Sequence, residues 1–306
     1  MSKKRSGKIF ALTFAVVFAT LSGLTILLVF PSGPTIYHFP STIPFNYQPW
    51  MNLIPSTAIS TAVINVSAVV SLGIPGSNNS FLTIYQINES LTPHNVILLA
   101  NYELPPSTPY ANSTEIDIFQ VTPTLYLKLQ QEMNKTALIP KQPYHGVLIY
   151  SILNNVSKAG GLISGSMAFY NGFIIYTQGS SSPIQDMQKA LSFVLGNYPS
   201  LFSNTTVQKA VYAATAGKTS FLSLLYLGYT TQLPQSVVAA KSVLQTQSGF
   251  VAVIAVGFSN ESQSVSNFKY FTRLYQGGSS YYVMDNFAVA NIHYTLATVG
   301  PQLQTF

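Results

Sequence analysis

The segment from Phe250 to Tyr275, FVAVIAVGFSNESQSVSNFKYFTRLY, contains the structural unit that recurs along this chain. It begins with Phe250–Phe258, which is apolar and rich in Val, as is typical of a buried strand. The polar stretch Ser259–Ser262 follows. Beyond it, apolar side chains recur at helical spacing, at Val265, Phe268, Phe271 and Tyr275. The pattern predicts a strand, a short turn and a helix near Gln263–Tyr275.

Two other places in the chain show the same unit. Ile116–Val121 has the composition of a strand and precedes a predicted helix at Thr124–Met133. Gly172–Thr177 precedes a predicted helix at Ile184–Leu195, which Ser182 and Pro183 introduce with an N-cap residue and a proline at the first helical position. The recurrence at about 140–215 and 220–290 suggests a degenerate duplication.

Further elements follow from β-branched and aromatic enrichment between turn residues, or from helical periodicity. We predict additional helices at Thr206–Ala216 and Gln235–Gln247. The remaining predicted strands are Ala58–Leu72, Phe81–Ile87, Asn95–Leu104, Phe221–Tyr229, Tyr281–Ala290 and His293–Val299. The expected fold class is α+β with a largely antiparallel sheet, in a domain over residues 57–306 with possible sub-units 57–140 and 141–306.

The N-terminus has the pattern of a membrane anchor. Basic residues in the segment 1–8 precede Ile9–Phe30, 22 residues without a charge. As a helix this stretch is about 33 Å long, close to the thickness of a bilayer core. The basic flank predicts that residues 1–8 are cytoplasmic and that the C-terminal domain is extracellular on a single-pass anchor. A cleaved signal, which would make the protein secreted, is the alternative.

Residues 31–56 contain six prolines interleaved with aromatic residues and Trp50. A Pro-rich stretch of this kind favours a semi-extended stalk between membrane and domain. The alternative is an N-terminal arm packed on the domain, and the presence of Trp50 favours this alternative.

Composition excludes several classes of protein. Only 7% of the residues are charged and 47% are apolar, which excludes a disordered chain. The absence of Cys excludes disulfide scaffolds and Cys-based metal or redox sites. Beyond the N-terminal basic cluster the positive charges are scattered and nearly balanced by negative ones, so we expect no nucleic-acid partner.

Sequons for N-glycosylation are frequent beyond the apolar segment, at Asn65, Asn78, Asn88, Asn112, Asn134, Asn155, Asn204 and Asn260. A chain that is simply rich in Asn, Ser and Thr is the alternative explanation. Low charge, no Cys and abundant Tyr and Phe make the composition resemble that of exported surface glycoproteins of thermoacidophilic archaea of the Sulfolobus type.

This resemblance implies a non-catalytic envelope component or a binding or adhesion module. Its partners would be the bilayer, through residues 9–30, and envelope proteins or further copies of the same chain. A secreted or vesicle-borne antimicrobial, similar to the sulfolobicins, is an alternative.

Catalytic motifs are scarce. The four His residues are isolated in sequence, so we expect no metal and no cofactor. No Gly-x-Ser-x-Gly occurs, and Ala216–Thr219 resembles the end of a phosphate-binding loop but has Tyr212 where the motif needs Gly. The remaining alternative is an acid hydrolase that uses a pair of carboxylates. Its weak candidates are Asp117 and Asp285, each predicted to lie in an apolar strand.

Overall fold

The structure is a computed structural model that describes residues 33–74, 81–105, 113–156, 161–178, 182–196, 198–218, 220–228 and 233–303. The chain separates into two units, Met1–Thr35 and Ile36–Phe306, and the second contains the folded domain. The predicted anchor at 9–30 lies outside the described residues. Within the described ranges, none of the helices combines the length and the hydropathy needed to cross a bilayer.

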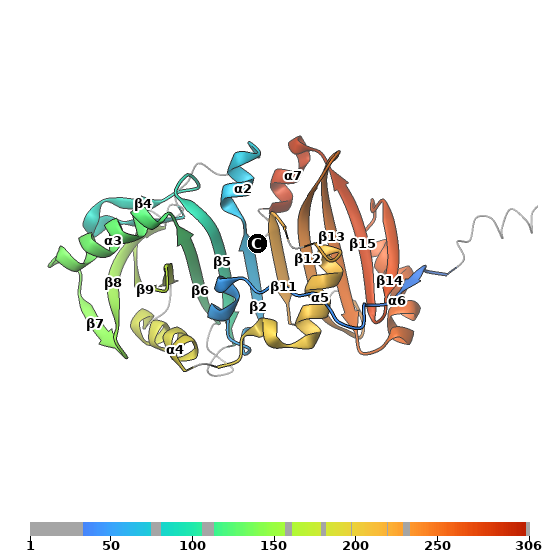
Figure 1. Cartoon of the computed structure of the whole chain (residues 1–306), viewed down its shortest axis with the longest axis horizontal. Helices are drawn as coiled ribbons and strands as arrows, with labels where there is room; N and C mark the ends of the chain where they lie inside the picture. Colours follow the sequence, from blue (N-terminus) through green and yellow to red (C-terminus); the bar gives the residue numbers. More distant parts are fainter. Residues whose placement is uncertain are drawn as a thin grey trace, which may run out of the picture. The chain divides into compact units, whose positions relative to one another are not determined.

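A single large sheet forms the framework of the domain (Figure 1). Its strand order is β1-β14-β15-β13-β12-β11-β2-β5-β6-β10-β9-β8-β7, and a separate hairpin joins β3 to β4. All pairs are antiparallel except β1 with β14, which confirms the predicted α+β class with a largely antiparallel sheet. The strands are β1 Ile36–Tyr37, β2 Ser60–Ile64, β3 Leu82–Ile84, β4 Glu89–Leu91, β5 Val96–Leu104, β6 Thr114–Val121, β7 Lys141–Tyr144, β8 Val147–Val156, β9 Gly161–Tyr170, β10 Phe173–Gln178, β11 Ser223–Leu227, β12 Ser236–Thr246, β13 Gly249–Phe258, β14 Ser280–Met284 and β15 Phe287–Tyr294.

Helices pack on both faces of the sheet, and they are α2 Val66–Ser71, α3 Pro123–Lys135, α4 Pro183–Leu195, α5 Thr205–Thr215, α6 Glu261–Leu274 and α7 Leu296–Leu303. We call the face that carries Ala100 and Val253 the covered face. There α4, α5 and residues 39–54 share one continuous apolar cluster with the strands. The opposite face, which carries Asn101 and Ala252, is the open face. It packs against α2, α3, α6, α7 and the β3–β4 hairpin, in three separate apolar clusters.

The connectivity of the sheet occurs twice. The elements β2, β5, β6, α3, β9 and β10 occur in the same order along the chain as β11, β12, β13, α6, β14 and β15, and their strands occur in the same order outward from the centre of the sheet. In the first series α2, β3 and β4 are inserted after β2, and β7 and β8 after α3. The two series meet where β2 pairs antiparallel with β11, centred on Ala62 and Leu225. This repeat relates residues 60–178 to residues 223–294, whereas the predicted duplication related about 140–215 to 220–290.

All three predicted strand–turn–helix units are present, as β6–α3, β10–α4 and β13–α6, and the predicted helix at Thr206–Ala216 is α5. The predicted helix at Gln235–Gln247 is wrong, because this segment is β12, held between β11 and β13. Its Ala and Lys residues have weak strand propensity, but pairing on both edges outweighs local preference.

Four predicted strands contain a break, and in one of them, Phe81–Ile87, β3 ends at Ile84 and Tyr85–Ile87 form a 3-10 helix. Ala58–Leu72 divides into β2 and α2 because the Asn65 side chain accepts a hydrogen bond from the Ala68 N–H and begins a helix. Tyr281–Ala290 is a hairpin that turns at Asp285, whose φ is 48°. His293–Val299 contains the end of β15 and the start of α7.

The expected stalk at 31–56 is also wrong for its described part. Trp50, Met51, Leu53 and Ile54 are buried in the cluster of the covered face, and Trp50 packs edge-on against Phe202 at 5.3 Å between ring centroids. This stretch is the packed arm of the alternative interpretation, because its aromatic and apolar side chains gain more by burial than in solvent.

Candidate functional site: a cavity on the open face

A cavity of about 1140 Å³ lies on the open face, over the junction of β2 and β11. Figure 1 shows α2 and α7 on either side of this junction. Apolar side chains form much of the wall, and they include Val66, Val69, Val70, Ile74, Leu225 and Leu303. The volume is slightly above the range of about 300–1,000 Å³ that is usual for small-ligand pockets.

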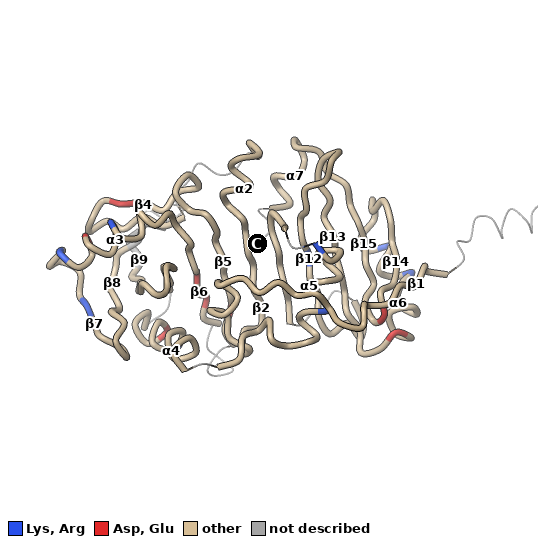
Figure 2. The backbone as a smooth tube through the Cα atoms, in the orientation of Figure 1, with Lys and Arg blue, Asp and Glu red and all other residues tan. Residues whose placement is uncertain are grey.

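The polar part of the wall lies on β5 and β6. Asn101 stands opposite Asp117 in the ladder between these strands, and Glu115 precedes Asp117 by two residues on the same face. Asn101 Nδ2 donates to Glu115 Oε1 at 2.7 Å and to Asp117 Oδ1 at 2.8 Å. One amide group thus holds two carboxylates side by side. Acidic positions on β6 are red in Figure 2.

The electrostatics of this end depend on Asp117. Burial raises the pKa of Asp117 to about 7, the hydrogen bond from Asn101 opposes the rise, and the negative charge of Glu115 adds to it. Glu115 itself is exposed. The carboxylate of Asp117 therefore changes its charge near neutral pH, which is far above the ordinary range of an Asp.

Asp285, the other predicted candidate, lies elsewhere. Six strands separate β6 from β14, so Asp117 and Asp285 do not form a pair. Asp285 lies in the β14–β15 turn, where it contacts the arm. His38 Nδ1 lies 2.6 Å from Asp285 Oδ1, and the Phe39 N–H donates to Asp285 Oδ2 at 3.1 Å. The hydrogen bond to Asp285 raises the pKa of His38.

His38, Asp285 and Glu261 each place a possible ligand atom within 4.8 Å of the others. Imidazole and carboxylate groups in such a trio can bind a divalent cation. No pattern in the sequence indicates this group, because its members come from the arm, the first residue of α6 and a hairpin turn. His38 and Glu261 are exposed.

The sequon residues have several different environments. Asn65, Asn204 and Asn260 are N-caps, and their side chains accept hydrogen bonds from Ala68, Thr206 and Gln263 respectively. Helix capping thus gives these three Asn residues a structural role besides any glycan. Of the others, Asn88 ends a 3-10 turn, exposed Asn134 accepts from the Tyr150 hydroxyl, Asn155 lies in β8, and Asn78 and Asn112 lie outside the described residues.

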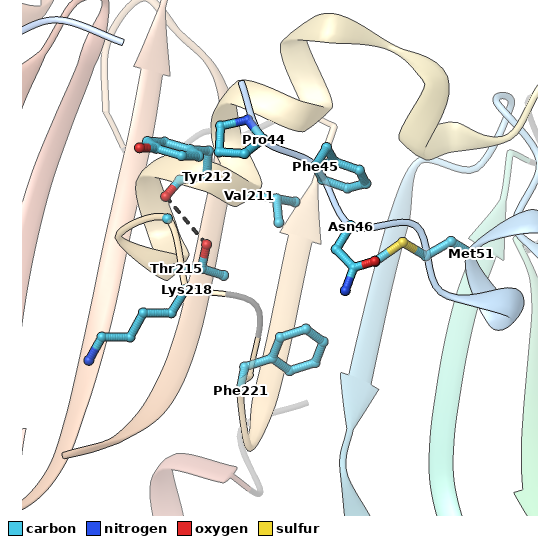
Figure 3. A pocket seen from close by; sticks show the side chains of 10 residues that line it. Pro44, Phe45, Asn46, Met51, Val211, Tyr212, Thr215, Lys218 and Phe221 are labelled. Carbon is cyan, nitrogen blue, oxygen red and sulfur yellow. Dashed lines mark hydrogen bonds between the residues drawn. The ribbon is translucent and has the colours of Figure 1, made fainter. Parts of the chain in front are cut away.

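A second hollow, between the arm and α5, is too small for a ligand. Figure 3 shows Phe45, Val211, Tyr212 and Lys218 around it, and its volume is about 30 Å³, enough for a water molecule. Ala216 and Lys218, from the sequence that resembles a phosphate loop, follow the C-terminal end of α5. Phosphate loops precede a helix N-terminus. Both this position and the missing glycine therefore argue against a phosphate loop.

Sequence reasoning identified Asp117 but missed Asn101, Glu115 and the cavity. Asn101 and Glu115 lie 14 residues apart and meet only through the pairing of β5 with β6. The available signal was polar residues at alternate positions in two strands that are otherwise apolar.

Comparison with known proteins supports the fold alone. No family model and no curated protein matches the sequence. Crystal form III of TP0453 is similar in structure with a TM-score of 0.50 and 11% sequence identity, over 85% of this chain and 99% of that one. Crystal forms I and IV of TP0453 give TM-scores of 0.48 and 0.46 at 12% and 11% identity, over 86% and 83% of this chain and 97% and 96% of theirs.

Proposed function

We propose that this chain is a non-catalytic binding module, anchored at the cell surface by residues 9–30 and N-glycosylated, and that it binds an amphipathic small molecule in the cavity of the open face. The observation that carries the binding activity is the cavity itself: about 1140 Å³, with apolar walls from α2, α7 and β11 and a polar end on β5 and β6. A long apolar chain fits the first part, and a polar head group fits the second.

Photolabelling of the full-length chain in liposomes tests this proposal. A dodecyl probe that carries a diazirine on its chain and a neutral maltoside head is irradiated, and the adducts are mapped by peptide mass spectrometry. We expect adducts on α2 and α7. Leu225→Trp extends a side chain into the cavity and should reduce them, whereas Leu148→Trp, at an exposed Leu on β8, should not. Adducts spread evenly over the domain, insensitive to Leu225→Trp, would contradict binding in the cavity.

The anchoring and the glycosylation are tested separately. Intact mass and N-terminal sequence of the native protein are measured after separation of cell membranes from medium. We expect a membrane-bound chain that retains Ile9–Phe30 and exceeds 33.3 kDa by the mass of several glycans. A shortened chain in the medium, without glycans, would contradict this part of the proposal and favour the secreted alternative.

One observation favours a second candidate, the acid hydrolase. The oxygens of Glu115 and Asp117 that accept from Asn101 Nδ2 lie no more than about 5.5 Å apart, an upper limit that is compatible with the carboxyl spacing of retaining glycosidases. Burial keeps Asp117 protonated below about pH 7, as a general acid requires. The pair is therefore Glu115 and Asp117, and Asp285 has no part in it.

Glu115→Gln and Asp117→Asn test the second candidate. Each should abolish hydrolysis of glycoside or peptide substrates, while Glu132→Gln, in α3 and outside the cavity wall, should leave it intact. If the unaltered chain hydrolyses none of these substrates, this candidate is eliminated.

A further inference from the structure

The polar end of the cavity carries hydrogen-bond acceptors and negative charge. Glu115, Asp117 and Asn101 line it, together with Ser60. Of the described residues on the cavity wall, none is Lys or Arg. A ligand head group that enters this end meets carboxylate oxygens before it meets any full positive charge.

The side-chain donors of Asn101, Ser60 and Thr61 are already used within the protein, and the exposed His94 is a further donor on the cavity wall. Both N–H groups of the Asn101 side chain are directed at Glu115 and Asp117. Ser60 Oγ donates to Glu103 Oε2 at 3.1 Å, and Thr61 Oγ1 donates to the Asn101 carbonyl at 2.9 Å. A carboxylate or phosphate head group would find no free donor on Asn101, Ser60 or Thr61 and would lie beside two acids, which is unfavourable.

We propose that the ligand of the cavity is an amphiphile with an apolar chain and a protonated amine head, which donates hydrogen bonds to Glu115 and Asp117. This inference rests on the proposed binding function. An ammonium group offers three donors and one positive charge, and both match what the cavity end presents. The apolar chain lies between α2 and α7, against Leu225.

In the competing arrangement, the ligand would have an anionic head group that lies near Lys241. Lys241 stands next to Leu225 in the ladder of β11 and β12, and its Nζ lies 3.4 Å from the carbonyl and from Oε1 of Gln302 in α7. An anionic head group turned toward β12 would use this cation. The two arrangements predict opposite orders of affinity for charged probes of equal chain length.

Three dodecyl probes with a diazirine on the chain and an ammonium, maltoside or carboxylate head separate these possibilities. The full-length chain is labelled in liposomes at pH 8, where Asp117 is ionised, and the yield of adducts on α2 and α7 is divided by the amount of membrane-bound probe. We expect the order ammonium, maltoside, carboxylate, with at least about a tenfold range from first to last.

The double variant Asp117→Asn/Glu115→Gln removes the charges with little change in shape. It should reduce ammonium labelling about tenfold, while maltoside labelling falls much less and verifies that the cavity persists. The control is Glu132→Gln, which removes an acid from α3, outside the cavity wall, and should change nothing.

The outcomes distinguish this inference from the function on which it rests. Carboxylate labelling equal to or above ammonium labelling overturns the amine head and favours the Lys241 side. Equal labelling by all three probes, unaffected by the double variant, also overturns it but leaves the binding module standing. No adducts on α2 and α7 with any probe overturns both.

Discussion

The two faces of the sheet are built from the same strands but are covered in different ways. On the covered face, one apolar cluster extends continuously from β8 to β15 beneath α4, α5 and the arm. On the open face the apolar side chains form three clusters, and the cavity lies between two of them, over β2 and β11. Continuous packing stabilises the fold, and the interruption provides room for a ligand. The following predictions test this division of roles.

The largest effect is expected from Trp50→Ala on the covered face. Trp50 is 3% exposed and packs on Phe202, so its truncation should lower the free energy of unfolding by about 3–5 kcal/mol in urea denaturation. Leu225→Ala, in the cavity wall, should cost less than about 2 kcal/mol, because Leu225 already borders open space. Equal costs at the two sites would show that the faces do not differ in this way.

Asp117 should make the open face sensitive to pH. Its pKa is about 7 in the folded chain and 3.8 as the ordinary value, so between these values the folded state binds more protons than the unfolded state. Stability then falls as pH rises through this window, and Asp117→Asn should remove on the order of 3 kcal/mol of that decline.

The free energy of unfolding is measured for the unaltered chain and for Asp117→Asn, and the difference between them is compared at pH 4 and pH 8. Glu115, His94 and Lys241, the other titratable groups near this end of the face, are present in both chains, and their direct contributions cancel to first order. A pH-independent difference for Asp117→Asn would show that the pKa of Asp117 is the same in the folded and the unfolded chain, which would contradict this prediction.

A moderate effect is expected at the helix caps. Asn260→Ala removes the acceptor for the Gln263 N–H and should cost about 1 kcal/mol of unfolding free energy. Asn260→Asp retains an acceptor oxygen but destroys the sequon, so it should keep the stability while any glycan at this site is lost. If Asn260→Asp destabilises a glycan-free chain as much as Asn260→Ala, capping is not the role of Asn260.

The smallest effect is expected at the contact between the arm and the β14–β15 turn. The hydrogen bond to Asp285 raises the pKa of His38 above 6.5, so its stabilisation is complete below that value and is lost as pH rises through the raised pKa. The melting temperature of His38→Ala should therefore be slightly lower than that of the unaltered chain at pH 5 and should equal it at pH 9. A gap that widens with pH would contradict the pairing with Asp285.

Local patterns predicted the elements that depend on local interactions. The strand–turn–helix units were found because apolar spacing and capping residues lie within about 25 residues of one another. Errors arose where a cap or turn residue was overlooked, as at Asn65 and Asp285, and where Ala and Lys concealed a paired strand, as in β12. The hairpin of β9 and β10 was missed although Asn171 and Gly172 form a typical two-residue turn with positive φ at both positions.

The amino-acid sequence by itself determined the class of the fold, the approximate starts of α3, α4, α5 and α6 and the candidacy of Asp117, because periodicity, caps and a charge in an apolar run are visible along the chain. Only the tertiary structure decided that Glu115 and Asn101 join Asp117, that Asp285 belongs with His38, and that a cavity lies between α2 and α7. Strand register and the position of uncovered surface arise from contacts between residues far apart in sequence, and no local pattern encodes them.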